Sequence, residues 1–295
     1  MSKVARHMFL FFIFDKIDLS LICLRKNNLF IQKWIIIKIC KGGAFMDIVL
    51  SRILKYLNGC LDDDHMYRIG LFVVHHYVEI EDYSLQRVID EGHFREDEIL
   101  DFCRHLGFET YEDFQNELIA DYMLRVSQIR ARMLGVSAAG LIEQLDPSYD
   151  KESLVKELEL ICELIFKNKR VILIGALYPT SIAVEFQTDF ITFGKEVIQY
   201  HHFVKDFQFQ KDDVVIFMSA TGRTLHDYLK ESAHQNIQDA QIVLLTQNVK
   251  YKNKNDLGAQ YVIQVPGRFD GIQFNYQMMM IFDVLRIYYY TKYYI

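Results

Sequence analysis

The sequence predicts an α/β protein in which an all-helical amino-terminal domain precedes a doubly wound parallel sheet. Short apolar runs rich in β-branched residues recur between residues 171 and 265, with helical patterns between most of them. Before residue 169 the apolar residues instead follow the three- and four-residue spacing of helices. The length of 295 residues fits about two domains. Because strands alternate with helices in the second half, we expect a parallel sheet there.

The amino-acid composition limits the classes of protein to which this chain could belong. The net charge of −6 argues against a chain that is basic throughout, and the 51% apolar content supports well-formed cores. The five cysteines include no CxxC pair, and their odd number favours a reducing cytoplasm over a disulfide framework. The adjacent pairs His75-His76 and His201-His202 point to different faces of their elements. We therefore expect a cytoplasmic protein with no metal and no cofactor.

Residues 1–45 differ from the rest of the chain. Two apolar bursts, at 8–14 and 34–39, are each too short for a bilayer, which needs roughly 20 residues. The Lys-Gly-Gly segment at 41–43 can be encoded by a ribosome-binding sequence just before Met46. We therefore expect 1–45 to be a leader or extension outside the native protein, with no membrane partner. The alternative is a membrane-surface anchor, since basic and aromatic residues suit that interface.

Residues 46–125 predict a small helical domain. Helices are expected at 66–77, at 85–91 after the cap Ser84, and at 95–106 before Gly107, a suitable C′ glycine. A three-residue turn, 92–94, joins the second helix to the third. This is the outline of a helix-turn-helix.

The third helix carries a resemblance to a family. Segment 102–108 reads FCRHLGF and segment 111–114 reads YEDF, which is similar to the end of the recognition helix in the RpiR family of bacterial regulators. The resemblance implies that 46–125 is an RpiR-type helix-turn-helix domain that binds double-stranded DNA. The candidate DNA-binding residues are Arg87, Arg95, Arg104 and His105.

The charge of this domain opposes that role. The first turn of the third helix contains Glu96, Asp97 and Glu98, and acids outnumber bases by roughly two to one across 46–135. Carboxylates repel phosphates, whereas DNA affinity rests on cations. Two readings stay open: ordinary operator binding, or a degenerate domain that has kept the fold and meets a protein partner.

A connector, 126–150, follows. It begins as a basic helical stretch, loosens between Gly135 and Gly140, and is broken at Pro147. Asp150 then caps a helix with an apolar stripe, which would dock on the next domain or on a second subunit. The stripe consists of Leu154, Leu158, Ile161, Leu164 and Ile165.

The remaining domain, 151–295, contains the expected sheet. Strands are predicted at 171–174, 197–200, 214–218, 242–245 and 261–265. Ligands of such sheets bind beyond the carboxyl ends of the strands, where the loops 175–181 and 219–224 lie. A final helix at 274–290 is apolar nearly all round, so we expect it to be buried, partly against a partner subunit.

The segment 212–231 is the centre of this domain. Its strand ends in SATGRT at 219–224, and a helical pattern begins directly afterwards. Hydroxyls and the free N–H groups of a helix's first turn favour an anion, and Gly222 permits close approach or a positive φ. The alternative is a plain cap, with Thr224 as the N-cap residue.

These two loops resemble those of the sugar isomerase (SIS) domain, a phosphosugar-binding module. In that family the first loop contains a serine that opens the helix, and a later strand ends in Ser-x-Ser-Gly-x-Thr. The resemblance implies a homodimer or higher homo-oligomer, and it implies a sugar-phosphate site. That site consists of Ser219, Thr221, Gly222 and Thr224 for the phosphate, with Ser181 or Thr180 for the sugar.

Together the two resemblances imply a DNA-binding transcriptional regulator, not an enzyme, whose SIS domain senses a sugar phosphate. One alternative is a phosphosugar isomerase. Its general base would be one of four residues that no spacing distinguishes: Glu185, His201, His202 and Asp270. The other alternative is a sugar-phosphate sensor whose degenerate helix-turn-helix binds a protein.

Overall fold

The computed structural model describes residues 48–60, 62–145, 150–175, 178–200, 207–230, 232–252, 258–267 and 272–294. All of them belong to one compact unit, 47–295, which is distinct from residues 1–46. The expected leader, 1–45, therefore lies outside the described residues, as do His201, His202 and Asp270. Among the described helices, none combines the length and the apolar character needed to cross a bilayer.

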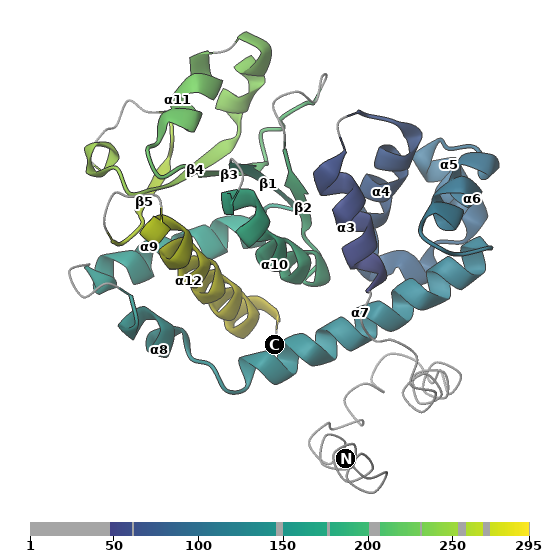
Figure 1. Ribbon diagram of the computed structural model, residues 1–295, viewed down its shortest axis with the longest axis horizontal. Helices are drawn as coiled ribbons and strands as arrows, with labels where there is room; N and C mark the ends of the chain where they lie inside the picture. Colours follow the sequence, from purple (N-terminus) through teal and green to yellow (C-terminus); the bar gives the residue numbers. More distant parts are fainter. Residues whose placement is uncertain are drawn as a thin grey trace, which may run out of the picture. The chain divides into compact units, whose positions relative to one another are not determined.

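The amino-terminal part is helical, as expected (Figure 1). The side chain of Ser84 accepts a hydrogen bond from the backbone N–H of Arg87, and Gly107 follows the third expected helix with a φ of +93°. Both predicted caps are thus confirmed. The elements are α3 (Val49–Gly59), α4 (His65–His75), the 3₁₀ helix η2 (Tyr77–Asp82), α5 (Leu85–Gly92), α6 (Glu96–His105) and α7 (Tyr111–Met133).

Helix α7 crosses the expected boundary at residue 125 without a break. Thr110 caps its first turn. The next glycine or proline in the sequence after Thr110 is Gly135, so 23 residues form one continuous helix. Two shorter helices follow, α8 (Ala138–Glu143) and α9 (Lys151–Lys167). Asp150 caps α9, as predicted. The helical domain and the connector therefore share one helix.

The sheet has five parallel strands in the order β2-β1-β3-β4-β5. All five expected strands are present, with ends that differ by at most one residue. This is the doubly wound order in which chain direction across the sheet reverses between β1 and β3. The strands are β1 (Arg170–Gly175), β2 (Glu196–Gln199), β3 (Val214–Met218), β4 (Gln241–Thr246) and β5 (Tyr261–Gln264).

Alternate strand residues enter two apolar layers, which explains why the strands read as unbroken apolar runs. Leu173 and Ile216 face the layer shared with α9, α10 (Tyr178–Thr192) and α12 (Ile272–Tyr289). Ile172 and Phe217 face the layer beneath α11 (Arg223–Lys230), on the other side of the sheet (Figure 1). Short elements complete the domain: η3 (Ser232–Asp239), η4 (Val249–Tyr251) and the π-helical turn η5 (Tyr290–Tyr294).

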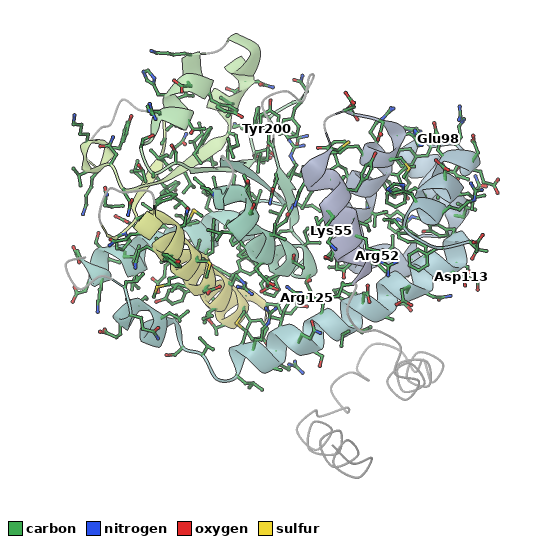
Figure 2. All side chains as sticks on the ribbon, in the orientation of Figure 1. Arg52, Lys55, Glu98, Asp113, Arg125 and Tyr200 are labelled. Atoms are coloured by element: carbon green, nitrogen blue, oxygen red, sulfur yellow. The ribbon has the colours of Figure 1, made fainter. Side chains whose placement is uncertain are left out.

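A buried ion-pair cluster joins α7 to α10 and α12. Asp189 of α10 is fully buried and accepts hydrogen bonds from Arg125 at 2.7 Å and from Arg286 at 2.6 Å. Arg132, about two helical turns beyond Arg125, adds a third contact at 3.1 Å. Figure 2 labels Arg125 at this junction. Removing one partner of such a buried cluster leaves an uncompensated charge, so the cluster fixes α7 against the sheet domain.

Candidate functional site

The loops after β1 and β3 start side by side at the carboxyl edge of the sheet. The two strands are hydrogen-bonded neighbours, and the last residue of each, Gly175 and Met218, are partners in the register. This is also the point at which the strand order reverses. Open α/β sheets place ligands in the crevice at that point.

The turn after β3 is held in one shape by backbone hydrogen bonds. The N–H of Ser219 donates to Leu245 on β4, and the N–H of Gly222 donates back to the carbonyl of Ser219, both at 3.0 Å. Gly222 has a φ of +76°, and α11 begins directly after it. A β-carbon at Gly222 would lie 2.3 Å from Cε2 of Tyr251, so only glycine fits.

The predicted phosphate residues surround the start of α11. Ser219 is buried, whereas Thr221 and Thr224 are half-buried. The hydroxyl of Thr221 accepts a hydrogen bond from the N–H of Arg223 at 3.3 Å, so Thr221 caps the helix. The alternative in which Thr224 is the N-cap is therefore wrong: the helix starts at Arg223, and Thr224 lies within its first turn.

Arg223 is a residue that sequence reasoning missed. Its Nε lies 3.4 Å from the Thr221 hydroxyl, and its side chain is exposed. The guanidinium therefore lies beside the hydroxyls of the turn, where it can donate two hydrogen bonds to a bound anion. The signal was available, since Arg223 lies within the SATGRT segment itself.

The first loop differs from expectation. Helix α10 begins at Tyr178, so Ser181 does not open the helix but lies inside its first turn. The physical reason is Pro179, whose fixed φ and missing N–H suit a helix start. Thr180 is buried and Ser181 is exposed. Both still belong to the first turn of a helix that starts at the carboxyl edge, next to the turn 219–222.

The end of β4 supports the turn and offers one further group. Thr246 donates its hydroxyl to the carbonyl of Ala220 at 3.0 Å, and Asn248 donates its side-chain amide to the carbonyl of Thr221 at 3.0 Å. Gln247 lies between them and donates Nε2 to Pro266 at 3.0 Å. Its Oε1 is buried and has no hydrogen-bond partner in the described ranges. That oxygen could accept a hydrogen bond from a ligand hydroxyl.

Glu185 is the one candidate general base among the described residues, and its carboxylate is already paired with arginines. Burial raises the pKa of Glu185, but the arginines Arg125, Arg132 and Arg286 outweigh it and hold the pKa below its usual range. Arg132 donates to its carboxylate at 3.1 Å. A carboxylate held as an anion by arginines is a poor proton acceptor at neutral pH.

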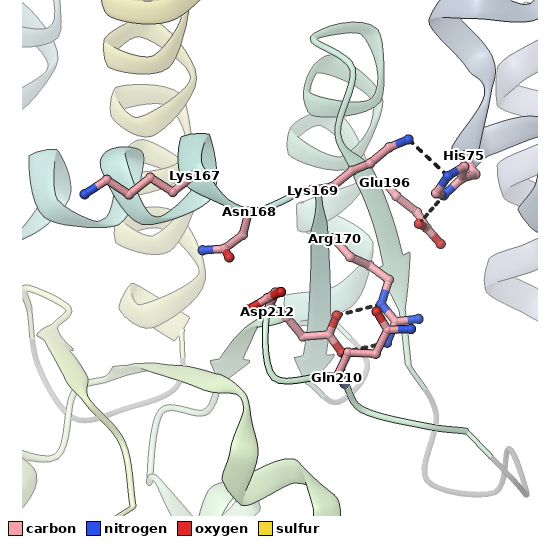
Figure 3. A pocket seen from close by; sticks show the side chains of 9 residues that line it. His75, Lys167, Asn168, Lys169, Arg170, Glu196, Gln210 and Asp212 are labelled. Carbon is pink, nitrogen blue, oxygen red and sulfur yellow. Dashed lines mark hydrogen bonds and ion pairs between the residues drawn. The ribbon is translucent and has the colours of Figure 1, made fainter.

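A cleft of about 690 Å³ lies at the opposite, amino edge of the sheet (Figure 3). Four of its ionisable groups pair with one another: Arg170 with Asp213 and His75 with Glu196, both at 2.6 Å. The carbonyls at the end of α9 also point here and accept from Lys195 at 2.7 and 2.8 Å. Because a helix carboxyl end repels anions, this edge of the sheet suits a phosphate poorly.

The predicted DNA-binding arginines each have an acidic neighbour. Arg87 pairs with Glu91 at 2.6 Å, Arg95 with Asp97 at 2.9 Å and Arg104 with Asp101 at 3.7 Å. His105 is exposed, and its ring lies edge-on to that of Tyr56. The acidic residue Glu98 has a structural role: its carboxylate accepts a hydrogen bond from the N–H of Arg95 and caps α6. The contact with DNA stays a prediction.

Comparison with known proteins finds similar structures only. No family model and no curated protein matches the chain. The NanR protein of Vibrio vulnificus complexed with ManNAc-6P is 15% identical with a TM-score of 0.37, over 83% of this chain and 92% of that one. A hypothetical protein is 18% identical with a TM-score of 0.40, over 57% and 92%. A hypothetical protein from Methanococcus jannaschii, inferred to be a 3-hexulose-6-phosphate isomerase, is 15% identical with a TM-score of 0.38, over 52% and 88%.

Proposed function

We propose that this protein is a transcriptional regulator that binds a sugar phosphate at the carboxyl edge of its sheet and changes its affinity for DNA in response. One observation carries the ligand site. Two helices, α10 and α11, begin at neighbouring strand ends where the strand order reverses, and hydroxyl residues lie in or just before both first turns. Helix amino ends with convergent hydroxyls favour a phosphate.

The phosphate half of the ligand is the better defined. The N–H groups at the start of α11 and the hydroxyls of Ser219 and Thr221 supply neutral donors. Arg223 supplies the charge, and charge-assisted hydrogen bonds are roughly twice as strong as neutral ones. The shape of the turn is set by the backbone, with Gly222 at positive φ, so it needs little rearrangement to receive the anion.

The sugar half is defined by hydroxyl chemistry. Gln247 Oε1 accepts a sugar hydroxyl, while Thr180 or Ser181 contacts another part of the ring. A buried acceptor without a partner costs about 1–3 kcal/mol, which a ligand hydroxyl recovers on binding. An apolar ligand has no hydroxyl to donate and could not make this contact. We therefore propose a polyhydroxyl ligand with one phosphate, and no metal or cofactor.

A thermal-shift series tests the ligand class. The probes are glucose 6-phosphate, fructose 6-phosphate and N-acetylmannosamine 6-phosphate, each beside its unphosphorylated sugar and beside inorganic phosphate. A ligand at 100 times its Kd stabilises the folded state by about 2.7 kcal/mol. We expect at least one sugar phosphate to raise Tm when neither the free sugar nor phosphate does so. Ser219→Ala should reduce the shift at least by about half, and Ser153→Ala, far along the chain in α9, should keep it in full. No shift with any probe refutes the site.

The DNA half of the proposal rests on the helix-turn-helix arrangement of α5 and α6 and is tested separately. Selection from random duplexes, with and without the stabilising sugar phosphate, should yield one enriched sequence whose affinity falls steeply with salt. The acid-paired arginines Arg87, Arg95 and Arg104 favour a second candidate, a sensor that meets a protein. The absence of any sequence-specific duplex in either state supports that candidate over DNA.

We also propose that the protein is not an isomerase. Glu185 is the only candidate base that the structure describes, and its lowered pKa makes it a weak base. Incubation of each stabilising sugar phosphate with the protein should leave its aldose-to-ketose ratio unchanged by NMR. Turnover that Glu185→Gln abolishes would reverse this view.

A further inference from the structure

A chain of buried amide groups connects the first turn of α10 with α3. It consists of the side chains of Asn58, Gln187 and Gln199 and ends at the backbone carbonyl of Thr180. Gln187 and Gln199 are 1% and 5% exposed, respectively. Asn58 belongs to α3 of the helical part, whereas the other residues belong to α10 and β2 of the sheet domain. We call this set the amide chain.

Each link of the amide chain is a hydrogen bond. Gln199 donates Nε2 to the carbonyl of Thr180 at 2.9 Å and to Oε1 of Gln187 at 3.4 Å. Asn58 donates Nδ2 to the same oxygen of Gln187 at 2.8 Å. Gln187 returns Nε2 to Oδ1 of Asn58 at 3.2 Å. Thr180 and Gln187 are seven residues apart on α10, about 10 Å along its axis.

Two backbone carbonyls fix the direction of every donor in the chain. Gln187 also donates Nε2 to the carbonyl of Val197 at 3.0 Å. A carbonyl accepts only, so the nitrogen of Gln187 must face Val197 and the nitrogen of Gln199 must face Thr180. Flipping either side chain would set an oxygen against a carbonyl. The chain therefore has one arrangement in which every link is made.

Two other contacts join the same two parts of the molecule without reaching Thr180. His75 of α4 meets Glu196 at 2.6 Å and Lys169 at 3.0 Å at the amino edge (Figure 3). Arg125 of α7 meets Asp189 at 2.7 Å, nine residues along α10 from Thr180. These contacts hold the parts together, but only the amide chain among them ends in the first turn of α10.

We propose that Asn58, Gln187 and Gln199 are positioning residues that couple the first turn of α10 to α3, so that ligand contact at Thr180 or Ser181 alters the helical part. A hydrogen bond weakens steeply once its atoms separate beyond about 3.5 Å. A shift of the first turn by about 1 Å breaks the link from Gln199 to Thr180, and the freed amide must find another partner. The use of the coupling by a sugar phosphate rests on the proposed function; the coupling itself does not.

Hydrogen exchange in the ligand-free protein tests the coupling. Asn58→Ala cuts the far end of the amide chain, and His75→Ala cuts a contact between the same two parts that is not in the chain. We expect the amides of residues 182–185, which bond back to the first turn of α10, to exchange at least about threefold faster in Asn58→Ala and at the wild-type rate in His75→Ala. Asn58→Gln keeps both a donor and an acceptor and should restore slow exchange. Equal rates in all variants, or equal acceleration in both alanine variants, overturn the proposal.

A second arm adds glucose 6-phosphate, fructose 6-phosphate and N-acetylmannosamine 6-phosphate in turn. Wild-type protein should show slower or faster exchange in α3 on binding, and Asn58→Ala should still bind by calorimetry but lose the α3 response. A wild-type response that persists in Asn58→Ala overturns the coupling while leaving the ligand site intact. Failure of every probe to bind refutes the proposed function, and the ligand-free arm then decides the coupling alone.

Discussion

The two edges of the sheet differ in what their polar groups already do. At the amino edge, the cleft contains several cations and anions, yet Arg170, Asp213, His75 and Glu196 pair with one another. At the carboxyl edge, formal charges are few, but the turn 219–222 presents hydroxyls and helix N–H groups, and one buried oxygen of Gln247 has no partner in the described ranges. Binding capacity follows uncommitted groups more closely than it follows the number of charges.

The polar groups at the amino edge hold secondary-structure elements together instead. Its ion pairs join the start of β1 to the residue before β3 and the start of β2 to α4, and Lys195 donates hydrogen bonds to the end of α9. A ligand at this edge would have to break pairs that already satisfy one another, whereas a ligand at the carboxyl edge would complete contacts. The difference predicts that substitutions at the amino edge change stability without changing ligand affinity, and that those at the carboxyl edge change ligand affinity.

The largest expected effect is at the amino edge. Arg170→Met should lower the free energy of unfolding by about 3–5 kcal/mol, because it leaves the buried carboxylate of Asp213 without its cation. Urea denaturation measures the loss, and affinity for the sugar phosphate should stay at the wild-type value. Arg95→Met, which removes an exposed pair with Asp97, is the matched control and should change stability little. A small loss for Arg170→Met would mean that the cleft is not held by its ion pairs.

Gly222→Ala tests the shape of the carboxyl edge. The new β-carbon would meet Tyr251 at 2.3 Å in a backbone conformation with a φ of +76°. We expect a loss of about 1–3 kcal/mol in stability and no measurable sugar-phosphate binding, by denaturation and calorimetry. Gly59→Ala, where a β-carbon meets nothing within 4 Å, should be harmless. Normal binding by Gly222→Ala would contradict the turn as the phosphate site.

Ser219→Ala tests a single donor at that edge. A hydrogen bond to a charged group is worth about 1.5–3 kcal/mol, so affinity for the sugar phosphate should fall by roughly ten- to a hundredfold. Calorimetry gives the affinity, and the change in Tm without ligand should be small. If affinity is unchanged, the hydroxyl of Ser219 does not contact the phosphate.

The smallest effect concerns pH at the amino edge. Burial, with Lys169 beside it, lowers the pKa of Lys195 to about 8. The unfolded chain then holds a proton that the folded protein releases between about pH 8 and 10.4, so Lys195 makes stability rise with pH across that window. The neutral amine still has two N–H groups for the carbonyls of Phe166 and Asn168. In Lys195→Met the rise should be shallower, as urea midpoints at pH 8, 9 and 10 can show; equal slopes would exclude this pKa.

Local signals in the sequence were sufficient for most of the fold. The strand Val214–Met218 was predicted because its apolar run is bounded by charges and by a small-residue turn, and Ser84 and Asp150 act as caps through bonds to residues three positions away. Contacts between distant residues left no such signal. Arg125 meets Asp189 across 64 positions, and Asn58 meets Gln187 across 129. The candidate site was predicted as two loops. Gln247 and the contact of Tyr251 with Gly222 could not be predicted, because they depend on how β4 and η4 pack.

The length of α7 has a mechanical consequence. A helix of 23 residues is about 34 Å long, and its second half is clamped by Asp189 while its first half packs among α3, α6 and η2. A tilt of one degree about that clamp moves a point about 30 Å away by roughly 0.5 Å. A small change in the direction of α7 at the sheet domain would therefore displace its first turn, against which α6 packs, by more than it displaces the residues at the clamp.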